Sequence, residues 1–185
     1  MTDLIWSFSP WFVFLIASRF VSFSGAVALG FMAAIVVLVR AASEHHVHTL
    51  DVVAPCYFAA VALALAIAHP HDVGTWSRYA QLGSHLVLTV FVFGSILVGR
   101  PFTESYARAT TPEEVWHTER FRDVNRRISA AWGVAFLVGD VSLALAGSVA
   151  ARQALLRVVI PFGALYLAFK YTETQRRSAR TSPEA

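Results

Sequence analysis

Long apolar runs, separated by short polar segments, dominate the chain. Residues 20–39, 52–68, 79–99, 128–151 and 153–169 each carry at most one charged residue. A helix rises about 1.5 Å per residue, so runs of about 20 residues match the roughly 30 Å hydrocarbon core of a bilayer. We therefore expect an all-α integral membrane protein with five transmembrane helices.

The first apolar segment, residues 4–18, is shorter than a typical span. Its fifteen residues cover only about 22 Å as a helix. Trp6 and Trp11 suit the membrane interface, and Pro10 suits the first turn of a helix that begins there. We expect a short N-terminal membrane-dipping helix. Because the segment lacks the positive start and cleavage site of a signal peptide, we expect it to be retained.

The longest hydrophilic segment, residues 100–127, follows the third expected span. Within it, Thr111, Pro112 and Glu114 occur in the order of a helix N-cap, a first-position proline and a capping-box glutamate. Apolar or aromatic positions then recur at steps of three and four, at His117, Phe121, Val124 and Ile128. We expect an amphipathic helix that begins at Pro112 and runs into the fourth span, either as a simple connector or as a partner-binding surface.

Composition supports membrane insertion. The chain is 56% hydrophobic, has a mean hydropathy of +0.56 and is only 15% charged, whereas roughly a quarter of the residues in soluble domains are charged. Its 185 residues leave no room for a separate soluble domain beside five spans. We expect a single transmembrane bundle over residues 1–170 and a disordered cytoplasmic tail over residues 171–185.

The basic residues predict the orientation. Eleven of the fifteen fall in the segments that would share one side of the membrane, namely Arg40, Arg100, Arg108, Arg120, Arg122, Arg126, Arg127, Lys170, Arg176, Arg177 and Arg180. The positive-inside rule places these segments and the C-terminus in the cytoplasm of a bacterial-type inner membrane. Orientation and anionic membrane lipids account for the net charge of +3, so we expect no nucleic-acid partner.

Asp140 is the ionisable residue in the middle of the fourth expected span. A carboxylate at the bilayer centre costs roughly 2.5 to 3.5 kcal/mol on insertion scales, so it should face the bundle interior, be protonated or pair with a base. Arg19, His85 and Arg157 are the available partners. Two interpretations of Asp140 stay open. It has a functional role, as an ion or proton relay or as a contact to a substrate, or it forms a structural hydrogen bond between helices.

Histidines raise the alternative of a metal or haem site. His45 and His48 are three residues apart, and His69 and His85 flank the turn between the second and third spans. The first pair has only Glu44 beside it, and haem bound between membrane helices needs two histidines at matching depth. We expect no metal and no cofactor. The sequence also lacks nucleophile-elbow, phosphate-loop and HExxH motifs, so we expect no enzymatic activity.

Small residues in the second expected span allow close helix packing. Ala60, Ala64 and Ala68 recur at one helical turn, a spacing that lets a neighbouring membrane helix approach closely. The alternative is that alanine is simply abundant in this span. Cys56, in the same run, is expected to be a small buried hydrophobic residue.

Several short motifs resemble the intracellular septation protein A family. They are WSFSPWFVFLIASRF near the N-terminus, VLVR at the end of the first span, GRPF after the third span, then PEEVW and AWGVAF. The resemblance implies that Arg19 ends the first apolar segment and that Pro101 follows the third span. It implies a polar-aromatic motif of Trp116, Asn125 and Trp132 leading into the fourth span, with longer steps between them than the family has.

The resemblance implies a role in septation or cell-envelope maintenance and brings no established chemistry with it. We accordingly expect a non-enzymatic inner-membrane protein that acts through contacts with other membrane proteins, or with further copies of itself. The alternative is a small homo-oligomeric transporter or channel that uses Asp140 and its partner within the membrane.

Overall fold

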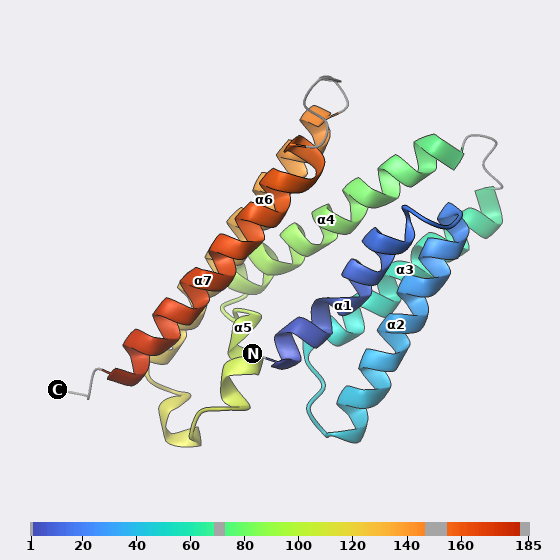
Figure 1. Cartoon of the computed structure of the whole chain (residues 1–185). Coiled ribbons are helices and arrows are strands. Elements are labelled where there is room, and N and C mark those ends of the chain that lie inside the picture. The colour runs from blue at the N-terminus through green and yellow to red at the C-terminus, as the bar shows by residue number, and fades with distance from the viewer. Residues whose placement is uncertain (1, 69–72, 147–154, 182–185) are drawn as a thin grey trace. The chain divides into compact units, whose positions relative to one another are not determined.

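A computed structural model describes residues 2–68, 73–146 and 155–181, and the side chains within 3–67, 82–146 and 155–179 (Figure 1). All the regular elements in these ranges are helices. The chain divides into two compact units, which we call unit 1 (Met1–Ser84) and unit 2 (His85–Ala185). The single bundle expected over residues 1–170 stays a prediction.

Unit 1 is built from three helices and the start of a fourth. Helices α1 (Thr2–Ala17), α2 (Phe23–Ser43) and α3 (Thr49–Ala68) pack against one another, and α4 (Val73–Leu97) begins here. Its core is aromatic and aliphatic, and its most deeply buried side chains include Phe14, Val27, Leu50 and Phe58. The helices of this unit therefore pack through large apolar side chains.

Pro10 lies inside α1 instead of at its start, so the expectation of a helix beginning there is wrong. Proline has no N–H, and in a helix interior it leaves the carbonyl four residues earlier without its donor. Here that carbonyl belongs to Trp6, and the Ser9 hydroxyl donates to it at 2.7 Å. The neighbouring serine thus replaces the missing backbone bond, and the helix continues through the proline.

Gly30 is where α2 comes closest to its neighbours. A Cβ atom on Gly30 would lie 2.7 Å from Phe58 Cε1 and 3.1 Å from Phe14 Cβ, closer than side chains normally pack. The expected alanine ridge does not supply this contact: Ala60 is exposed, Ala64 is half-buried, and the side chain of Ala68 lies outside the described residues. A glycine facing two aromatic rings provides the close approach instead.

Cys56 is exposed, so the expectation that it is buried is wrong. It lies on α3 two residues before the fully buried Phe58. Two positions along a helix correspond to about 200° of rotation, which places the two side chains on opposite faces. Helix α3 therefore has a buried face that contains Phe58 and an exposed face that contains Cys56.

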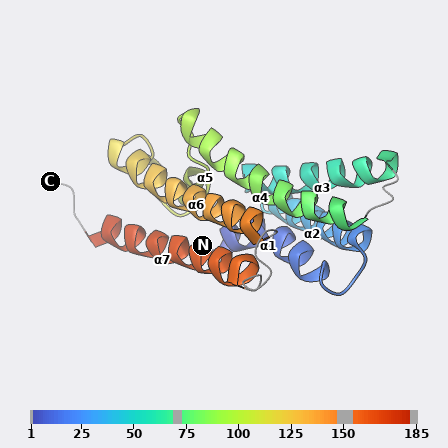
Figure 2. The ribbon, with the colours of Figure 1, turned by 90° about the horizontal axis from the view of Figure 1, so that it is seen from above.

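Unit 2 contains the end of α4 followed by a pair of long helices. Helices α6 (Glu119–Ala146) and α7 (Ile160–Thr181) lie side by side in both views and run in opposite directions (Figures 1 and 2). The short helix α5 (Thr103–Arg108) packs against α6. A π-helical turn, η3 (Leu155–Val159), leads directly into α7.

The amphipathic helix before the fourth span begins later than expected. Pro112 has an extended ψ of 149° and is followed only by a 3₁₀ turn, η1 (Glu113–Val115). The α-helix starts at Glu119, where the Thr118 hydroxyl accepts a hydrogen bond from the Phe121 N–H at 3.2 Å. The expected start at Pro112 is therefore wrong, and Thr118 performs the capping assigned to Thr111.

The expected apolar stripe on this helix is partly confirmed. Phe121 and Ile128 are buried, Val124 is half-buried, and His117 is exposed and lies before the helix. The helix runs without a break into the apolar segment that contains Asp140. The amphipathic connector and the expected fourth span are therefore one element.

Helix α7 continues well past Lys170, into the segment where a disordered tail was expected. Its last turns carry ion pairs from Glu173 to Lys170 at 3.2 Å and to Arg177 at 3.8 Å. Arg176 donates to the Thr110 hydroxyl at 3.1 Å, and Arg120 on α6 donates to the Ser178 carbonyl at 3.4 Å. These contacts connect the end of α7 to the start of α6 and to the loop after α5.

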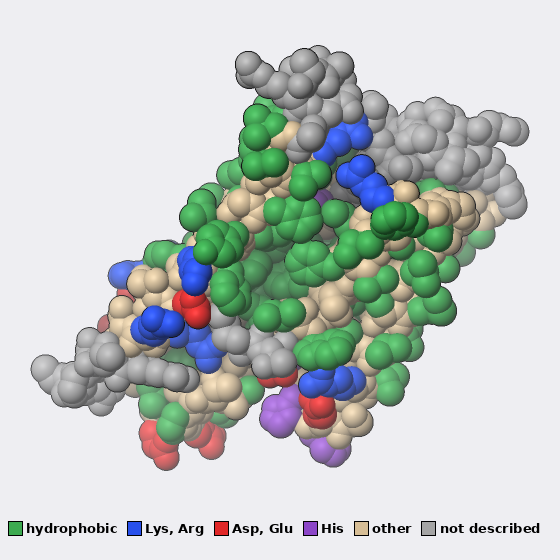
Figure 3. Space-filling model, in the orientation of Figure 1, with side chains coloured by type: hydrophobic (Ala, Val, Ile, Leu, Met, Phe, Trp, Pro, Cys, Tyr) green, Lys and Arg blue, Asp and Glu red, His purple; other side chains and the backbone are tan. Residues whose placement is uncertain are grey.

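Four described helices are long and apolar enough to cross a membrane, where five had been expected. They are Phe23–Ser43, Thr49–Ile67, Glu119–Ala146 and Leu155–Ala179. Two shorter apolar helices, Asp3–Ala17 and Leu82–Leu97, correspond to the expected N-terminal dipping helix and to part of the expected third span. Hydrophobic side chains, drawn in green, are widespread on the face shown in Figure 3. These features indicate a multi-pass membrane protein.

We expect Gly30→Ala to lower the free energy of unfolding by about 1–3 kcal/mol, because Phe58 and Phe14 must move to admit the new methyl group. The matched control is Gly94→Ala, since an added Cβ there meets nothing within 4 Å. Removing a helix-interior glycine should leave stability unchanged or raise it by about 0.5–1 kcal/mol. Unfolding in detergent micelles, followed by circular dichroism, measures both. Equal effects would contradict the close approach.

Candidate functional site

Asp140 faces α4 inside unit 2. The Thr89 hydroxyl on α4 donates a hydrogen bond of 2.6 Å to Asp140 Oδ2 on α6. Thr89 is buried, and one helical turn before it on the same face lies His85. His85 Nδ1 is 4.0 Å from the second carboxylate oxygen, Asp140 Oδ1. The structure thus brings together Asp140 and one of its three expected partners, and adds Thr89, which the sequence did not single out.

The two facing atoms of this site are buried and unpartnered. Asp140 Oδ1 and His85 Nδ1 have no hydrogen-bond partner among the described residues, and both atoms are shielded from solvent. Their separation of 4.0 Å is too long for a direct hydrogen bond. Buried polar atoms are usually satisfied, so two that face one another mark a place where a proton, a water or an ion fits.

Gly139 makes the approach of His85 possible. A Cβ atom on Gly139 would lie 3.1 Å from His85 Nδ1 and 3.4 Å from its Cε1, and 3.8 Å from Pro161 Cβ on α7. The missing side chain therefore admits the imidazole ring against α6 next to Asp140. Helix α4, helix α6 and the start of α7 meet at this point.

A helix irregularity lies next to the site. In the π-helical register of η3, the Leu156 carbonyl would pair with the N–H of residue 161, but Pro161 has none. The Ser142 hydroxyl on α6 donates to that carbonyl instead, at 2.6 Å. The helix is therefore irregular next to Pro161, as a π-turn stabilised by a serine two residues beyond Asp140.

Neither expected arginine joins Asp140. Arg157 lies in η3 and is half-buried, and Arg19 lies just past the end of α1 in unit 1 and is exposed. Within the described ranges neither side chain forms an ion pair. His85 is therefore the basic side chain that the structure places beside Asp140.

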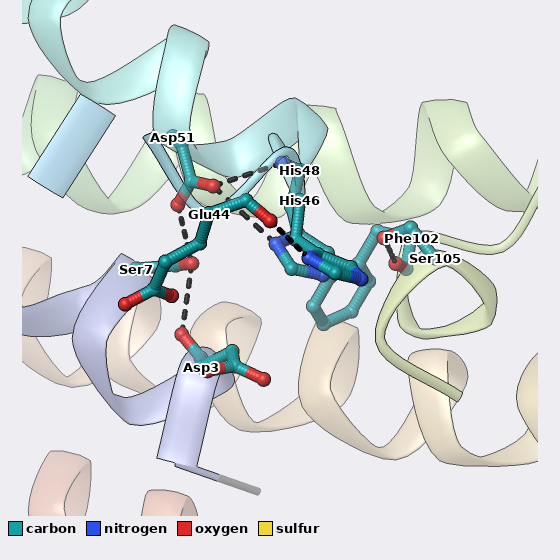
Figure 4. Close-up of polar contacts among 8 residues, drawn as sticks. All are labelled: Asp3, Ser7, Glu44, His46, His48, Asp51, Phe102 and Ser105. Carbon is teal, nitrogen blue, oxygen red and sulfur yellow. Dashed lines mark hydrogen bonds and ion pairs between the residues drawn. The ribbon is translucent and has the colours of Figure 1, made fainter. Parts of the chain in front are cut away.

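A second buried carboxylate, Asp51, lies in unit 1 and was not recognised from the sequence. Asp51 Oδ1 accepts from the Ser7 hydroxyl of α1 at 2.5 Å, and Oδ2 accepts from the His48 backbone N–H at 2.8 Å (Figure 4). His48 Nδ1 lies 3.4 Å from Oδ2, and all three side chains are buried. Both oxygens are satisfied, so this cluster ties α1 to the start of α3.

The signal for this cluster was present in the sequence. Asp51 follows His48 by three residues, at the start of an apolar run, and a carboxylate at that position can accept from the backbone N–H of the cap residue. From the sequence, His48 is instead a candidate metal ligand together with His45. His45 has a positive φ of 57° in the turn between α2 and α3, and it is exposed.

The residues highlighted by the family resemblance occupy structural positions in unit 2. The Thr103 hydroxyl donates to the Asn125 carbonyl at 3.0 Å, and the Asn125 side-chain amide donates to the Phe121 carbonyl at 2.8 Å. Trp132 Nε1 donates to the Thr172 hydroxyl at 3.1 Å. These contacts join α5, α6 and α7 to one another.

The remaining two motif positions lie around the short connector. Pro101 is buried just before α5. Trp116 donates from Nε1 to the Thr111 carbonyl at 3.0 Å, and the Arg108 guanidinium lies 5.2 Å from the centre of its ring. The aromatic side chain therefore closes the loop between α5 and α6.

In the described parts of the chain, no three His, Cys, Asp or Glu side chains gather closely enough to hold a metal ion. His69, one of the histidines weighed as a ligand, lies outside the described residues. The pair at Asp140 and His85 offers one oxygen and one nitrogen, fewer ligands than structural or catalytic metal sites use.

No family model, curated protein or solved structure matches this chain. The resemblance to the septation family therefore stays a prediction, and we infer the function from the chain's own residues.

We expect Asp51→Ala to lower the free energy of unfolding by about 1–3 kcal/mol, because the buried His48 N–H loses its acceptor and the Ser7 hydroxyl loses one. The matched control, Asp123→Ala, removes an exposed carboxylate whose partner Arg127 is 3.8 Å away. It should change stability by less than about 0.5 kcal/mol. Denaturant titration of the purified protein in micelles compares the two. A control effect as large as that of Asp51→Ala would contradict the buried role.

Proposed function

We propose that this chain is a small multi-pass membrane transporter or channel, whose polar centre is Asp140 with Thr89 and His85. The observation that supports this proposal is the pair of unpartnered, buried atoms Asp140 Oδ1 and His85 Nδ1 within an apolar helical unit. Ionisable residues inside membrane helices are costly and commonly mark substrate or ion pathways. A purely structural carboxylate would be expected to have both of its oxygens satisfied.

In this proposal the protein lies in a bacterial-type inner membrane with its C-terminus in the cytoplasm. The support is the basic character of residues 100–127 and of the end of α7. Within residues 100–127, Arg122 and Arg126 are exposed. Those positions suit the anionic headgroups of the cytoplasmic leaflet. A fifth span would come from α4, which is 25 residues long and whose described apolar part is Leu82–Leu97.

The envelope and septation role rests on the resemblance alone and stays a prediction. The family-motif positions Asn125 and Trp132 are buried and make their contacts within unit 2. These two side chains therefore stabilise the packing of unit 2 and do not form a surface for binding another membrane protein. The intramembrane polar centre favours the transport function over the scaffold function.

The orientation predicts the behaviour of reporter fusions. Green fluorescent protein fused to the C-terminus should fluoresce, and alkaline phosphatase fused at the same place should be inactive, because basic segments stay on the cytoplasmic side. Fusions after Ala68, at the end of α3, should show the opposite pattern, because α2 and α3 are then both present and the reporter follows a complete pair of spans. Active phosphatase at the C-terminus would overturn the orientation without affecting the polar centre.

The transport function predicts that Asp140→Asn lowers ion flux at least tenfold. The substitution keeps the shape of the side chain and an acceptor for Thr89, but removes the ionisable group. Purified protein in liposomes is tested with separate gradients of protons, sodium and potassium, using ion-sensitive dyes. The matched control is Asp123→Asn, an exposed carboxylate on the same helix, which should keep wild-type flux.

Two results would contradict this function. One is wild-type flux no higher than that of protein-free liposomes for all three ions. The other is equal flux in wild type and Asp140→Asn. Size-exclusion chromatography and thermal unfolding of both variants confirm that a change in flux does not come from misfolding.

A further inference from the structure

We propose that the species handled at the polar centre is a proton, which Asp140 and His85 exchange through one water molecule held between Oδ1 and Nδ1, and that Gly139 positions His85 for this exchange. The proposal rests on the transport function and names its substrate.

The hydrogen bond from Thr89 determines which oxygen carries the proton. A hydroxyl that donates to Asp140 Oδ2 makes Oδ2 an acceptor. The other oxygen, Oδ1, has no hydrogen-bond partner among the described residues and faces His85 Nδ1, so in this proposal the neutral acid carries its proton on Oδ1. The carboxyl group is held with its acidic proton directed to the base.

The separation of the two atoms fits a relay through water. At 4.0 Å they are too far apart for direct transfer, but a group within reach through one water still serves as an acid or a base. Asp140 Oδ1 gives its proton to the water oxygen, and the water gives another of its protons to His85 Nδ1. The result is a carboxylate and an imidazolium, with the water regenerated.

The ligand set of the site argues against a dehydrated metal cation. Calcium takes six to eight oxygen ligands, and magnesium demands octahedral coordination. The site offers one free carboxylate oxygen, and the described residues bring no third His, Cys, Asp or Glu to it. A proton needs only one donor and one acceptor, which is what the site supplies.

Few ionisable side chains surround the pair formed by Asp140 and His85. On the stretches of α4, α6 and η3 that meet here, the ionisable side chains among the described residues are His85, Asp140 and Arg157. Arg157 lies within the π-turn and makes no ion pair with a described residue. Asp140 and His85 therefore exchange a proton as a pair, with no second carboxylate competing for it.

Gly139 acts as a positioning residue, because the space of its missing side chain is taken by the His85 ring. An added Cβ would lie 3.1 Å from His85 Nδ1, so the ring must move away from Asp140. Gly163→Ala, on α7, is the matched control, since its added Cβ meets nothing within 4 Å.

The experiment combines proton flux in liposomes with nitrogen NMR of protein labelled in its histidines. We expect Gly139→Ala and His85→Gln each to reduce proton flux at least tenfold, and Gly163→Ala to keep it within twofold of wild type. The NMR signal of His85, assigned as the one missing in His85→Gln, should shift in Asp140→Asn and in Gly139→Ala but not in Gly163→Ala.

The outcomes separate this proposal from the transport function. Flux of sodium or potassium without proton flux overturns the proton assignment and leaves transport standing. A His85 signal that responds to Asp140→Asn, in a protein that moves no ion, supports the proton exchange and overturns transport. A His85 signal unmoved by both substitutions overturns the exchange. If Gly139→Ala fails to fold, His85→Gln and Asp140→Asn decide the question.

Discussion

A polar group inside hydrocarbon has no water to pair with, so it needs a partner within the protein. Two prolines show it most clearly. Pro10 frees the Trp6 carbonyl, and the Ser9 hydroxyl donates to it. Pro161 frees the Leu156 carbonyl, and the Ser142 hydroxyl of another helix donates to it. In each case a serine supplies the missing donor, so the carbonyl freed by the proline keeps a hydrogen bond.

Close packing in both units depends on glycines that face rings. Gly30 admits Phe58 and Phe14 in unit 1, and Gly133 admits Phe93, whose Cζ would lie 2.9 Å from an added Cβ. Gly139 admits the His85 ring in the same way. Lipid offers helices no hydrophobic reason to associate, so contacts of this kind, in which a ring fills the space above a glycine, provide van der Waals attraction. A ring packed against a glycine therefore serves both the apolar core, at Gly30 and Gly133, and the polar centre, at Gly139.

The sequence predicted the helices better than their contacts. Apolar length alone located the long helices, because a bilayer requires about 20 apolar residues per span. Helix starts depend on single capping bonds, and Thr111 and Thr118 are equally plausible caps until the ψ angle of Pro112 is known. Asp140 was found because a charge in an apolar run is conspicuous. Thr89 was not, because a threonine in such a run is ordinary until its partner is known.

The contrast between the two buried carboxylates, Asp51 and Asp140, supports a functional role for Asp140. Asp51 accepts from Ser7 at one oxygen and from the His48 N–H at the other, so its hydrogen bonding is complete within unit 1. Asp140 accepts from Thr89 at one oxygen only, and its second oxygen faces a ring nitrogen that is equally unpartnered. A structural carboxylate reduces the cost of its burial by satisfying both oxygens, as Asp51 does. Asp140 leaves one oxygen free opposite a base, an arrangement that costs stability and is suited to binding and releasing a proton.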